Sequence, residues 1–252
     1  MNITPIKTRI VHKGDNLEEI LSESLPTLIE ESVLVVSSKI VALSENAVVE
    51  KKLGTKDEKW ELVKQQSELY TDPNDSPYQL MLTIKDQILA VNAGIDESNA
   101  EGDYVLLPQD RYQSAERIWQ FVRQKYNLKR VGVIITDSRT FPLKWGIIGT
   151  CLAHCGFKAL NNRIGEPDLF GHQMQMTQEN IAEALAISAN LVMGEVAEAQ
   201  PLAIIENVPM VQFQDNPPSS EELEQLKISL LDDAYSPILK TAAWIKGGAY
   251  KG

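Results

Sequence analysis

Short apolar runs rich in β-branched residues constrain this fold more than any other feature of the sequence. Val33–Val36, Val131–Ile135 and Leu202–Ile205 have the length of strands and no charged residue, which is typical of strands buried on both faces. Stretches with helical spacing accompany them, at residues 56–69, 78–84, 177–193 and 221–231, with one more beginning at residue 115. The pattern predicts buried strands alternating with helices.

Polar residues follow several predicted strands at the point where the strand ends. Three such segments are Ser37–Lys39, Asn92–Asn99 and Thr136–Ser138. We expect the first to be a loop at a strand tip, the second to be rich in turns, and the third to end its strand. Strand ends of α/β-type sheets present ligand groups from rigid supports, so Asp96, Asn99 and Asp137 form the strongest candidate site.

Two carboxylates at one site repel each other unless a cation or a shared proton offsets the charge. Asp96 and Asp137 are therefore candidate ligands of Mg²⁺ or Mn²⁺, which prefer oxygen donors. The alternative is structural, because Asp and Asn residues at strand ends commonly close turns by bonding to their own backbone.

The composition limits which partners the protein is expected to bind and in which cellular compartment it is expected to work. With 252 residues and 43% hydrophobic content, the chain can bury the core of one large domain or of two packed subdomains. A formal charge of -11 opposes binding to a nucleic-acid backbone. Two cysteines, the lack of an apolar leader, and the lack of any run near the roughly 20 apolar residues of a membrane helix predict a cytoplasmic protein without a membrane partner.

Several blocks, in order along the chain, resemble the coenzyme F420:L-glutamate ligase family. They are Gly14–Leu17, Val33–Ile40, Asn92–Asn99, Leu106–Asp110, Val131–Ser138, Ile164–Gly165, Asp168–Gly171, Ala189–Glu195 and Pro201–Ile205. The resemblance covers about residues 4–206. It implies an α+β fold of mixed sheets with flanking helices. It also implies one domain over residues 1–213, made of two interlocked, intimately packed subdomains. For residues 214–252, the run Pro217–Ser220 and the glycines near the end predict a linker, a helix and a mobile tail.

The same resemblance implies a chemistry. Members form a homodimer and bind GTP with two divalent cations, and the reaction joins a small carboxylate to the amine of an amino acid such as L-glutamate. Carried over by position, three residues would hold Mg²⁺ or Mn²⁺ and three would touch GTP or ATP. The metal set is Asp96, Asp137 and Ser138, and the nucleotide set is Ser38, Lys39 and Asn99. No catalytic residue beyond these is assigned.

The chain departs from the family after Asp137. Thr140, Phe141 and Lys144 stand where the family has a glycine and two arginines, and Leu43 replaces a nucleotide-binding lysine. The planar guanidinium group of arginine can bind a phosphate through two parallel hydrogen bonds and lysine cannot, so anion recognition should differ in this chain. We therefore keep two functions open: an acid–amino-acid ligase with altered specificity, and a noncatalytic or regulatory homologue that binds a small anion. A third function, glutamylation of F420 itself, is disfavoured by the loss of these cationic residues.

Other residues invite functional interpretations that we judge weaker. Cys151, His154 and Cys155 lack the further ligands of a zinc site, so we expect the cysteines to pack as small apolar residues on one face of a helix. Trp119 and Trp145 could stack on a ring, but we expect both to serve the core.

Overall fold

A computed structural model describes residues 1–251. The chain has a mixed α+β fold and divides into two compact units. Unit 1 contains residues 1–46, 108–138 and 147–226, and unit 2 contains residues 47–107 and 139–146 and the chain from 227 onward. The prediction of a boundary near residue 213, with two interlocked subdomains before it, stays a prediction.

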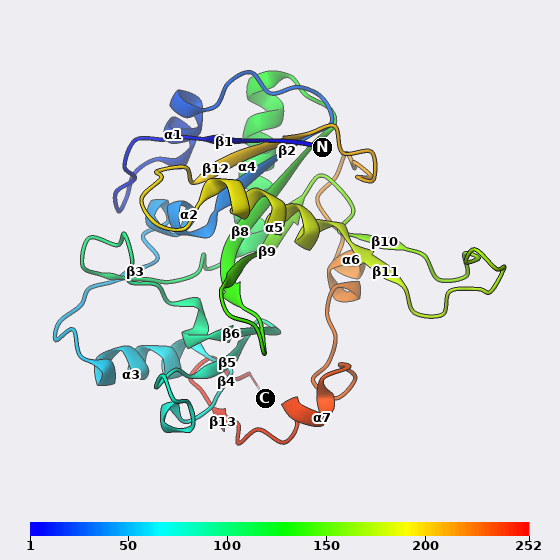
Figure 1. Ribbon diagram of the computed structural model, residues 1–252. Coiled ribbons are helices and arrows are strands. Elements are labelled where there is room, and N and C mark those ends of the chain that lie inside the picture. The colour runs from blue at the N-terminus through cyan, green and yellow to red at the C-terminus, as the bar shows by residue number, and fades with distance from the viewer. Residues whose placement is uncertain (252) are drawn as a thin grey trace. The chain divides into compact units, whose positions relative to one another are not determined.

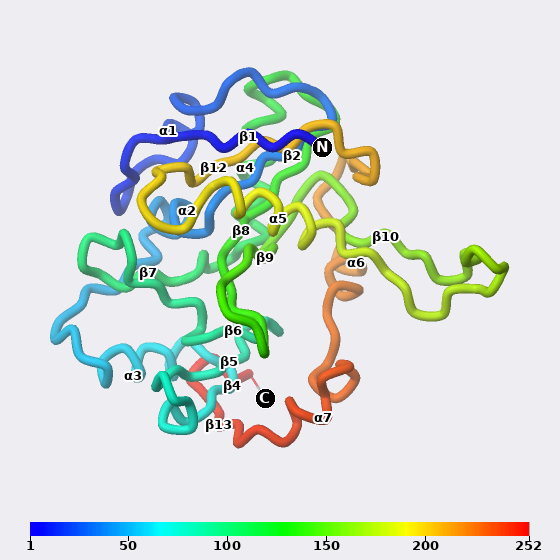
Figure 2. Tube along the Cα trace, in the orientation of Figure 1, coloured from blue at the N-terminus to red at the C-terminus, as the bar shows by residue number. Residues whose placement is uncertain are grey.

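Unit 1 is built on a five-stranded sheet with the order β1-β12-β2-β8-β9. Its strands are β1 (Asn2–Ile6), β12 (Leu202–Glu206), β2 (Ser32–Ser37), β8 (Val131–Thr140) and β9 (Ile147–Cys155). β2 and β8 run parallel, whereas β12 is antiparallel to both β1 and β2. In Figure 2 the blue β1 lies beside the yellow to orange β12, so segments from distant parts of the sequence close this sheet.

The three apolar runs are confirmed as strands β2, β8 and β12 at the centre of this sheet, because continuous β-branched sequence suits strands covered on both faces. Their side chains share a core with helix α5. That core includes Val33, Val35, Ile134, Phe157, Leu185, Ala189, Ala203 and Ile205. The core thus fixes the first half of β8. Thr136–Ser138, which we expected to end this strand, lie within it because β8 continues to Thr140.

The helices of unit 1 are α1 (Leu17–Ser24), α2 (Ser38–Ser44), α4 (Arg111–Tyr126), α5 (Ile181–Met193) and α6 (Ser220–Gln225). Each of them except α2 begins at a side-chain cap. Asn16, Asp110 and Asn180 cap α1, α4 and α5 by accepting from amides of the first turn. Ser38 and Lys39 open α2 rather than forming the loop that we expected, because the chain turns into a helix directly after β2.

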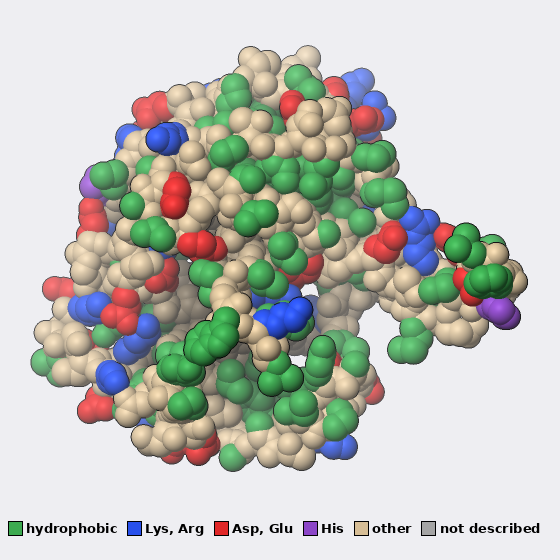
Figure 3. Space-filling model, viewed as in Figure 1, with side chains coloured by type: hydrophobic (Ala, Val, Ile, Leu, Met, Phe, Trp, Pro, Cys, Tyr) green, Lys and Arg blue, Asp and Glu red, His purple; other side chains and the backbone are tan. Residues whose placement is uncertain are grey.

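An arm over residues 160–180 extends from the rest of unit 1 (Figure 1). Its base is the antiparallel pair β10 (Leu160–Asn162) and β11 (Gln178–Asn180). Hydrophobic side chains gather toward its end (Figure 3), where Leu169 is 99% exposed and Phe170 is 86% exposed. Leu169 and Phe170 therefore form an exposed apolar pair on the arm.

Unit 2 contains a four-stranded antiparallel sheet with the order β13-β4-β5-β6. Its strands are β13 (Ile245–Lys246), β4 (Leu69–Tyr70), β5 (Leu82–Lys85) and β6 (Ile88–Val91). The remaining elements are the pair β3 (Val48–Val49) and β7 (Tyr104–Val105), helices α3 (Lys56–Gln66) and α7 (Ser236–Leu239), and 3₁₀ turns η1 (Pro73–Asp75) and η2 (Asn92–Gly94). Leu62, Val63, Met81, Ile95 and Tyr104 pack together as its core.

The segment at Gly247 and Gly248 is hydrogen-bonded to other residues of unit 2. Gly247 N donates to Glu68 O, and Gly248 N donates to Lys64 O near the end of α3, both at 2.9 Å. A Cβ on Gly247 would overlap the main-chain oxygen of Ser67, so this approach requires glycine. The predicted mobility of the tail stays a prediction.

Two predicted helices differ from the structure. Residues 78–84 are not a helix, since Gln79 has a positive φ of 56° and Leu82–Lys85 form β5. Pairing with β4 and β6 outweighs the weak helical spacing there. The predicted helix at 221–231 is α6, which ends at Gln225. Within residues 1–251, no helix is both long and apolar enough to cross a membrane.

Candidate functional site

The candidate site of unit 1 lies where β8 emerges from the core. Val131–Thr136 are buried, and Asp137 and Ser138 are half-buried. Thr136 Oγ1 donates to the main-chain oxygen of Thr150 at 3.0 Å, which ties this end of β8 to β9. The strand therefore presents Asp137 and Ser138 from a fixed backbone.

Ser138 contacts a carboxylate that sequence reasoning did not assign to the site. Its Oγ lies 2.9 Å from both carboxylate oxygens of Glu195 and donates to them. Glu195 directly follows Gly194, which ends α5 with a φ of 83°. Asn190, one turn earlier on α5, donates from Nδ2 to Ser138 Oγ at 3.4 Å. An acid directly after a helix-ending glycine was the available sequence signal for Glu195.

Helix α5 is held against β9 at two levels. A Cβ on Gly149 would lie 2.5 Å from Asn190 Cβ and 2.7 Å from Ala186 O, so the strand and the helix touch at their backbones. Nearer the start of α5, Glu183 accepts from Thr150 Oγ1 at 3.0 Å and from Cys151 N at 3.2 Å. These contacts fix where Asn190 and Glu195 lie relative to Ser138.

Asp96 lies in unit 2 and closes a turn. Its Oδ1 accepts from Glu97 N at 2.6 Å and from Ser98 N at 2.8 Å, and Ser98 Oγ lies 3.0 Å from both of its carboxylate oxygens. Asn99 completes the turn with a φ of 50°. The structural alternative thus describes this segment well. The metal role of Asp96 and the nucleotide role of Asn99 stay predictions.

Charged residues surround this turn. Glu97 bridges Lys51 and Lys59 with contacts of 2.5 Å each, and Lys51 Nζ lies 5.0 Å from the centre of the Tyr104 ring. The ammonium groups of Lys51 and Lys59 lower the pKa of Glu97 and outweigh the opposing effect of its burial. The acid therefore stays charged and holds the turn to its own unit.

Ser38 and Lys39 form the first turn of α2. Ser38 is buried and Lys39 is half-buried. Leu43, on the same helix, is only 5% exposed. The position at which the resemblance places a nucleotide-binding lysine is thus a buried leucine here. Nucleotide binding by Ser38 and Lys39 stays a prediction.

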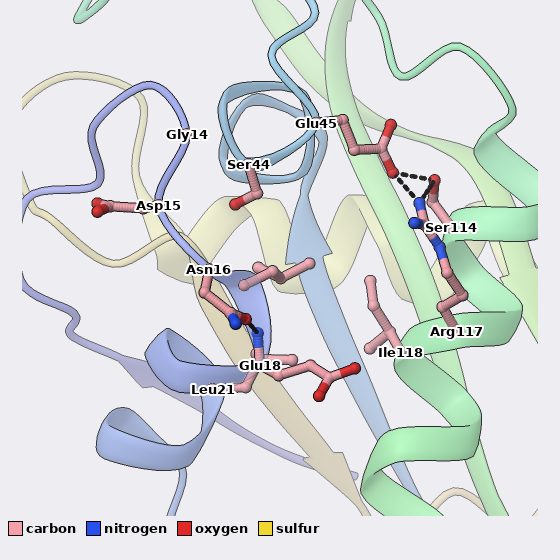
Figure 4. A pocket seen from close by; sticks show the side chains of 11 residues that line it. Gly14, Asp15, Asn16, Glu18, Leu21, Ser44, Glu45, Ser114, Arg117 and Ile118 are labelled. Carbon is pink, nitrogen blue, oxygen red and sulfur yellow. Dashed lines mark hydrogen bonds and ion pairs between the residues drawn. The ribbon is translucent and has the colours of Figure 1, made fainter.

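A pocket of about 310 Å³ opens elsewhere in unit 1 (Figure 4). It lies among the start of α1, the end of α2 and the start of α4, and none of the predicted site residues line it. Glu45 accepts there from Ser114 Oγ and from Arg117 Nη2. Because Glu45 already accepts hydrogen bonds from Ser114 and Arg117, we judge this pocket a weaker candidate for the functional site than the segment Asp137–Ser138 of β8.

The two cysteines lie on strand β9, so the expected helix is wrong at this position. Cys151 and Cys155 share one face because side chains alternate along a strand. Burial raises the pKa of Cys151, and it raises the pKa of Cys155 to about 12, so neither is a reactive thiolate. No three His, Cys, Asp or Glu side chains among residues 1–251 gather as a group that could hold a metal.

The tryptophans have opposite environments. Trp119 is 3% exposed and donates from Nε1 to Val131 O at 2.8 Å, so its predicted core role is confirmed. Trp145 is 92% exposed, and the prediction that it serves the core is wrong. It lies between β8 and β9, where it meets the ring of Tyr78 edge-on with centroids 6.2 Å apart. Segments that connect strands run over the protein surface, so their side chains are commonly left exposed to solvent.

Comparisons with known proteins identify the family. The sequence model of the F420-0:Gamma-glutamyl ligase family matches residues 5–207. The chain is 32% identical over 214 residues to the coenzyme F420:L-glutamate ligase of Methanosarcina mazei, covering 79% of this chain and 82% of that protein. It is 33% identical over 191 residues to the enzyme of that name from Methanococcus maripaludis, covering 76% and 75%. It is also 42% identical over 127 residues to that of Methanocaldococcus jannaschii, about half of each chain (50% and 51%). The chain therefore belongs to the F420-0:Gamma-glutamyl ligase family.

Proposed function

We propose that this protein is a ligase that joins L-glutamate, or a similar amino acid, to a small-molecule carboxylate, with GTP or ATP as the phosphoryl donor. The observation that carries the proposal is the family match over residues 5–207 together with relatives named coenzyme F420:L-glutamate ligase. The contact of Ser138 with Glu195, within a segment that resembles the family's metal-binding block, supports it.

Ser138 and Glu195 could both bind a divalent cation. They offer only oxygen donors, the ligand type that suits Mg²⁺ and Mn²⁺. Ser138 Oγ lies 2.9 Å from the Glu195 carboxylate, so both residues face one small volume. We assign these two residues to cation binding, and from the resemblance we also assign Asp96 and Asp137 to cation binding. When bound, the cation would offset the negative charge of the nucleotide phosphates.

The reaction needs activation of the acceptor, because a free carboxylate is a poor electrophile. The acceptor oxygen takes the terminal phosphoryl group of the nucleotide and the nucleoside diphosphate leaves. The amine nitrogen of glutamate then attacks the acyl carbon, the C–N bond forms as the C–O bond breaks, phosphate departs, and the nitrogen loses a proton. Within this scheme Ser38, Lys39 and Asn99 are assigned to nucleotide binding.

The acceptor of this chain is expected to differ in its anionic part from that of relatives with two arginines after Asp137. Phe141 and Lys144 occupy those positions, and Lys144 Nζ lies 5.8 Å from the centre of the Phe141 ring. A single ammonium beside an aromatic ring binds a phosphate as a point charge and without the bidentate geometry of arginine. Replacing both positions by arginine should favour a more highly charged acceptor.

The proposal is tested by incubating the protein with an acceptor, L-glutamate, Mn²⁺ and either GTP or ATP. The first acceptor to try is F420-0, from the name of the family. A ligase yields an acceptor whose mass has grown by one glutamyl residue, together with nucleoside diphosphate and phosphate, and omission of any one component stops the reaction. The noncatalytic alternative predicts binding of an anionic ligand with no amide product from a panel of carboxylates.

We also propose that the protein forms a homodimer and that the arm contributes to it. Leu169 and Phe170 at the arm's end are almost fully exposed, and covering such side chains with a second copy would remove apolar surface from water. Replacing both residues by Ser should shift the mass measured by light scattering from two chains to one. An unchanged dimeric mass would exclude the arm, and a monomeric wild type would exclude the dimer.

A further inference from the structure

Asn190 occupies a position on α5 where an amide is unexpected. It is 9% exposed, and the other buried residues of the helix are apolar: Ala182, Leu185, Ala186, Ala189 and Met193. Asparagine has a lower helix propensity than these alanines, leucine and methionine, and burying an amide costs free energy unless it is hydrogen-bonded. Neither helix propensity nor burial therefore favours asparagine at this position, and the hydrogen-bond partner of its side chain explains its presence.

That partner is Ser138. Asn190 Nδ2 donates to Ser138 Oγ at 3.4 Å, and Ser138 Oγ in turn donates to the Glu195 carboxylate at 2.9 Å. A serine hydroxyl has one proton and two lone pairs. With the proton directed at Glu195 and one lone pair directed at Asn190, only one lone pair of Ser138 is left for another ligand, and its direction is set by the other two bonds.

The backbone around Asn190 restricts how far its amide can move. Gly149 of β9 lies so close that a Cβ there would come within 2.5 Å of Asn190 Cβ. Glu183, on the same helix, binds Thr150 and Cys151 of the same strand. The helix thus cannot slide along β9 without breaking these contacts, and the amide of Asn190 stays within reach of Ser138.

We propose that Asn190 is a positioning residue that orients the Ser138 oxygen toward a divalent cation. This inference rests on the proposed function, because it assumes a cation at Ser138 and Glu195. Asn190 itself binds neither the cation nor the substrate. It acts by holding the hydroxyl so that no reorientation is needed when the cation arrives, as residues behind metal ligands commonly do.

The test measures Mn²⁺ binding to the full chain by the loss of the free Mn²⁺ EPR signal. Asn190→Ala should raise the dissociation constant about tenfold, the lower end of what removal of a residue behind a metal ligand does. Asn190→Leu, which fills the space but donates nothing, should do the same if the alanine variant folds poorly. Asn180→Ala is the matched control, since it removes the cap of the same helix without touching Ser138. It should lower the melting temperature and leave the dissociation constant unchanged.

A double-mutant cycle separates positioning from general support of the helix. If Asn190 acts through Ser138, Asn190→Ala should cause no further loss of Mn²⁺ affinity in a Ser138→Ala background. Equal losses in both backgrounds, or equal effects of Asn180→Ala and Asn190→Ala, would overturn the proposal. Mn²⁺ binding that depends on Asp137 and Ser138 but not on Asn190 would overturn the positioning role alone. A wild-type protein that binds no Mn²⁺ would overturn both this role and the proposed cation site.

Discussion

Trp119 and Val131 are joined by a hydrogen bond from the indole Nε1 to the main-chain oxygen at 2.8 Å, and Gly156 lies directly against this bond. A Cβ on Gly156 would overlap both bonded atoms, and the residue also has a φ of +80°. The bond links α4 to the start of β8, which is the strand that carries Asp137 and Ser138. A side chain at residue 156 would therefore disturb the support of the candidate site.

Gly156→Ala should lower the free energy of unfolding by about 3 kcal/mol, because it combines backbone strain with overpacking at a buried hydrogen bond. Gly171→Ala is the control, since Gly171 has a nearly identical φ of +85° but nothing within 4 Å of its Cβ position. It should cost about 1 kcal/mol from backbone strain alone. Urea unfolding measures both values, and equal losses would show that the contact with Trp119 and Val131 adds nothing.

Glu195→Gln should remove most of the rise in melting temperature that Mn²⁺ gives the wild type. The substitution keeps the side-chain volume, and the amide can still accept from Ser138 Oγ, but it lacks the negative charge that a cation requires. Glu198→Gln is a nearby control whose carboxylate accepts from Val196 N in its own loop. Thermal shift with and without Mn²⁺ gives the comparison, and a full Mn²⁺ response in Glu195→Gln would exclude Glu195 as a ligand.

Asp96→Ala and Asp137→Ala should each abolish the stabilisation by Mn²⁺, as expected of ligands carried over from the resemblance. The two variants should differ without metal. Asp96 closes its own turn through two backbone amides, so its loss should lower the basal stability by about 1 kcal/mol or more. An unchanged Mn²⁺ response in both variants would refute the assignment of both residues.

His154 should make the protein less stable as the pH falls from about 6.5 toward 4. Burial lowers the pKa of this imidazole to about 4 in the folded state, where the rings of Tyr112 and Phe157 have centroids 6.0 and 5.3 Å away. The unfolded chain binds the proton near pH 6.5, so it holds more protons between these two values and is favoured there. The stability is fully present above about pH 6.5, and about 3 kcal/mol of it is lost by pH 4.

Urea unfolding of wild type and His154→Leu across this pH range measures that contribution. The advantage of the wild type over the variant should shrink as the solution is acidified. His172→Leu is the control, because its side chain is 81% exposed in the arm and lies outside the core. If the stability of His154→Leu changed with pH as much as that of the wild type, His154 would not be the cause of the pH dependence of stability.

Much of unit 1 was predictable because its central strands have a local signature. Continuous apolar, β-branched segments have few stable alternatives to a buried strand, and β2, β8 and β12 appear where the runs predicted them. The predictions were wrong for segments with weaker patterns. Residues 78–84 have helical spacing but pair into a sheet, and Cys151 and Cys155 lie on a strand, because tertiary pairing outweighs small differences in local propensity.

The sequence by itself determined the buried strands, the polar residues at their ends and the family, because these depend on the order of residue types along the chain. Only the tertiary structure decided which side chains meet. The contact of Ser138 with Glu195 and Asn190 joins residues more than fifty positions apart, and Gly149 allows it through a close approach of strand and helix. The exposure of Trp145 likewise depends on which segments cover it, and no local pattern carries that information.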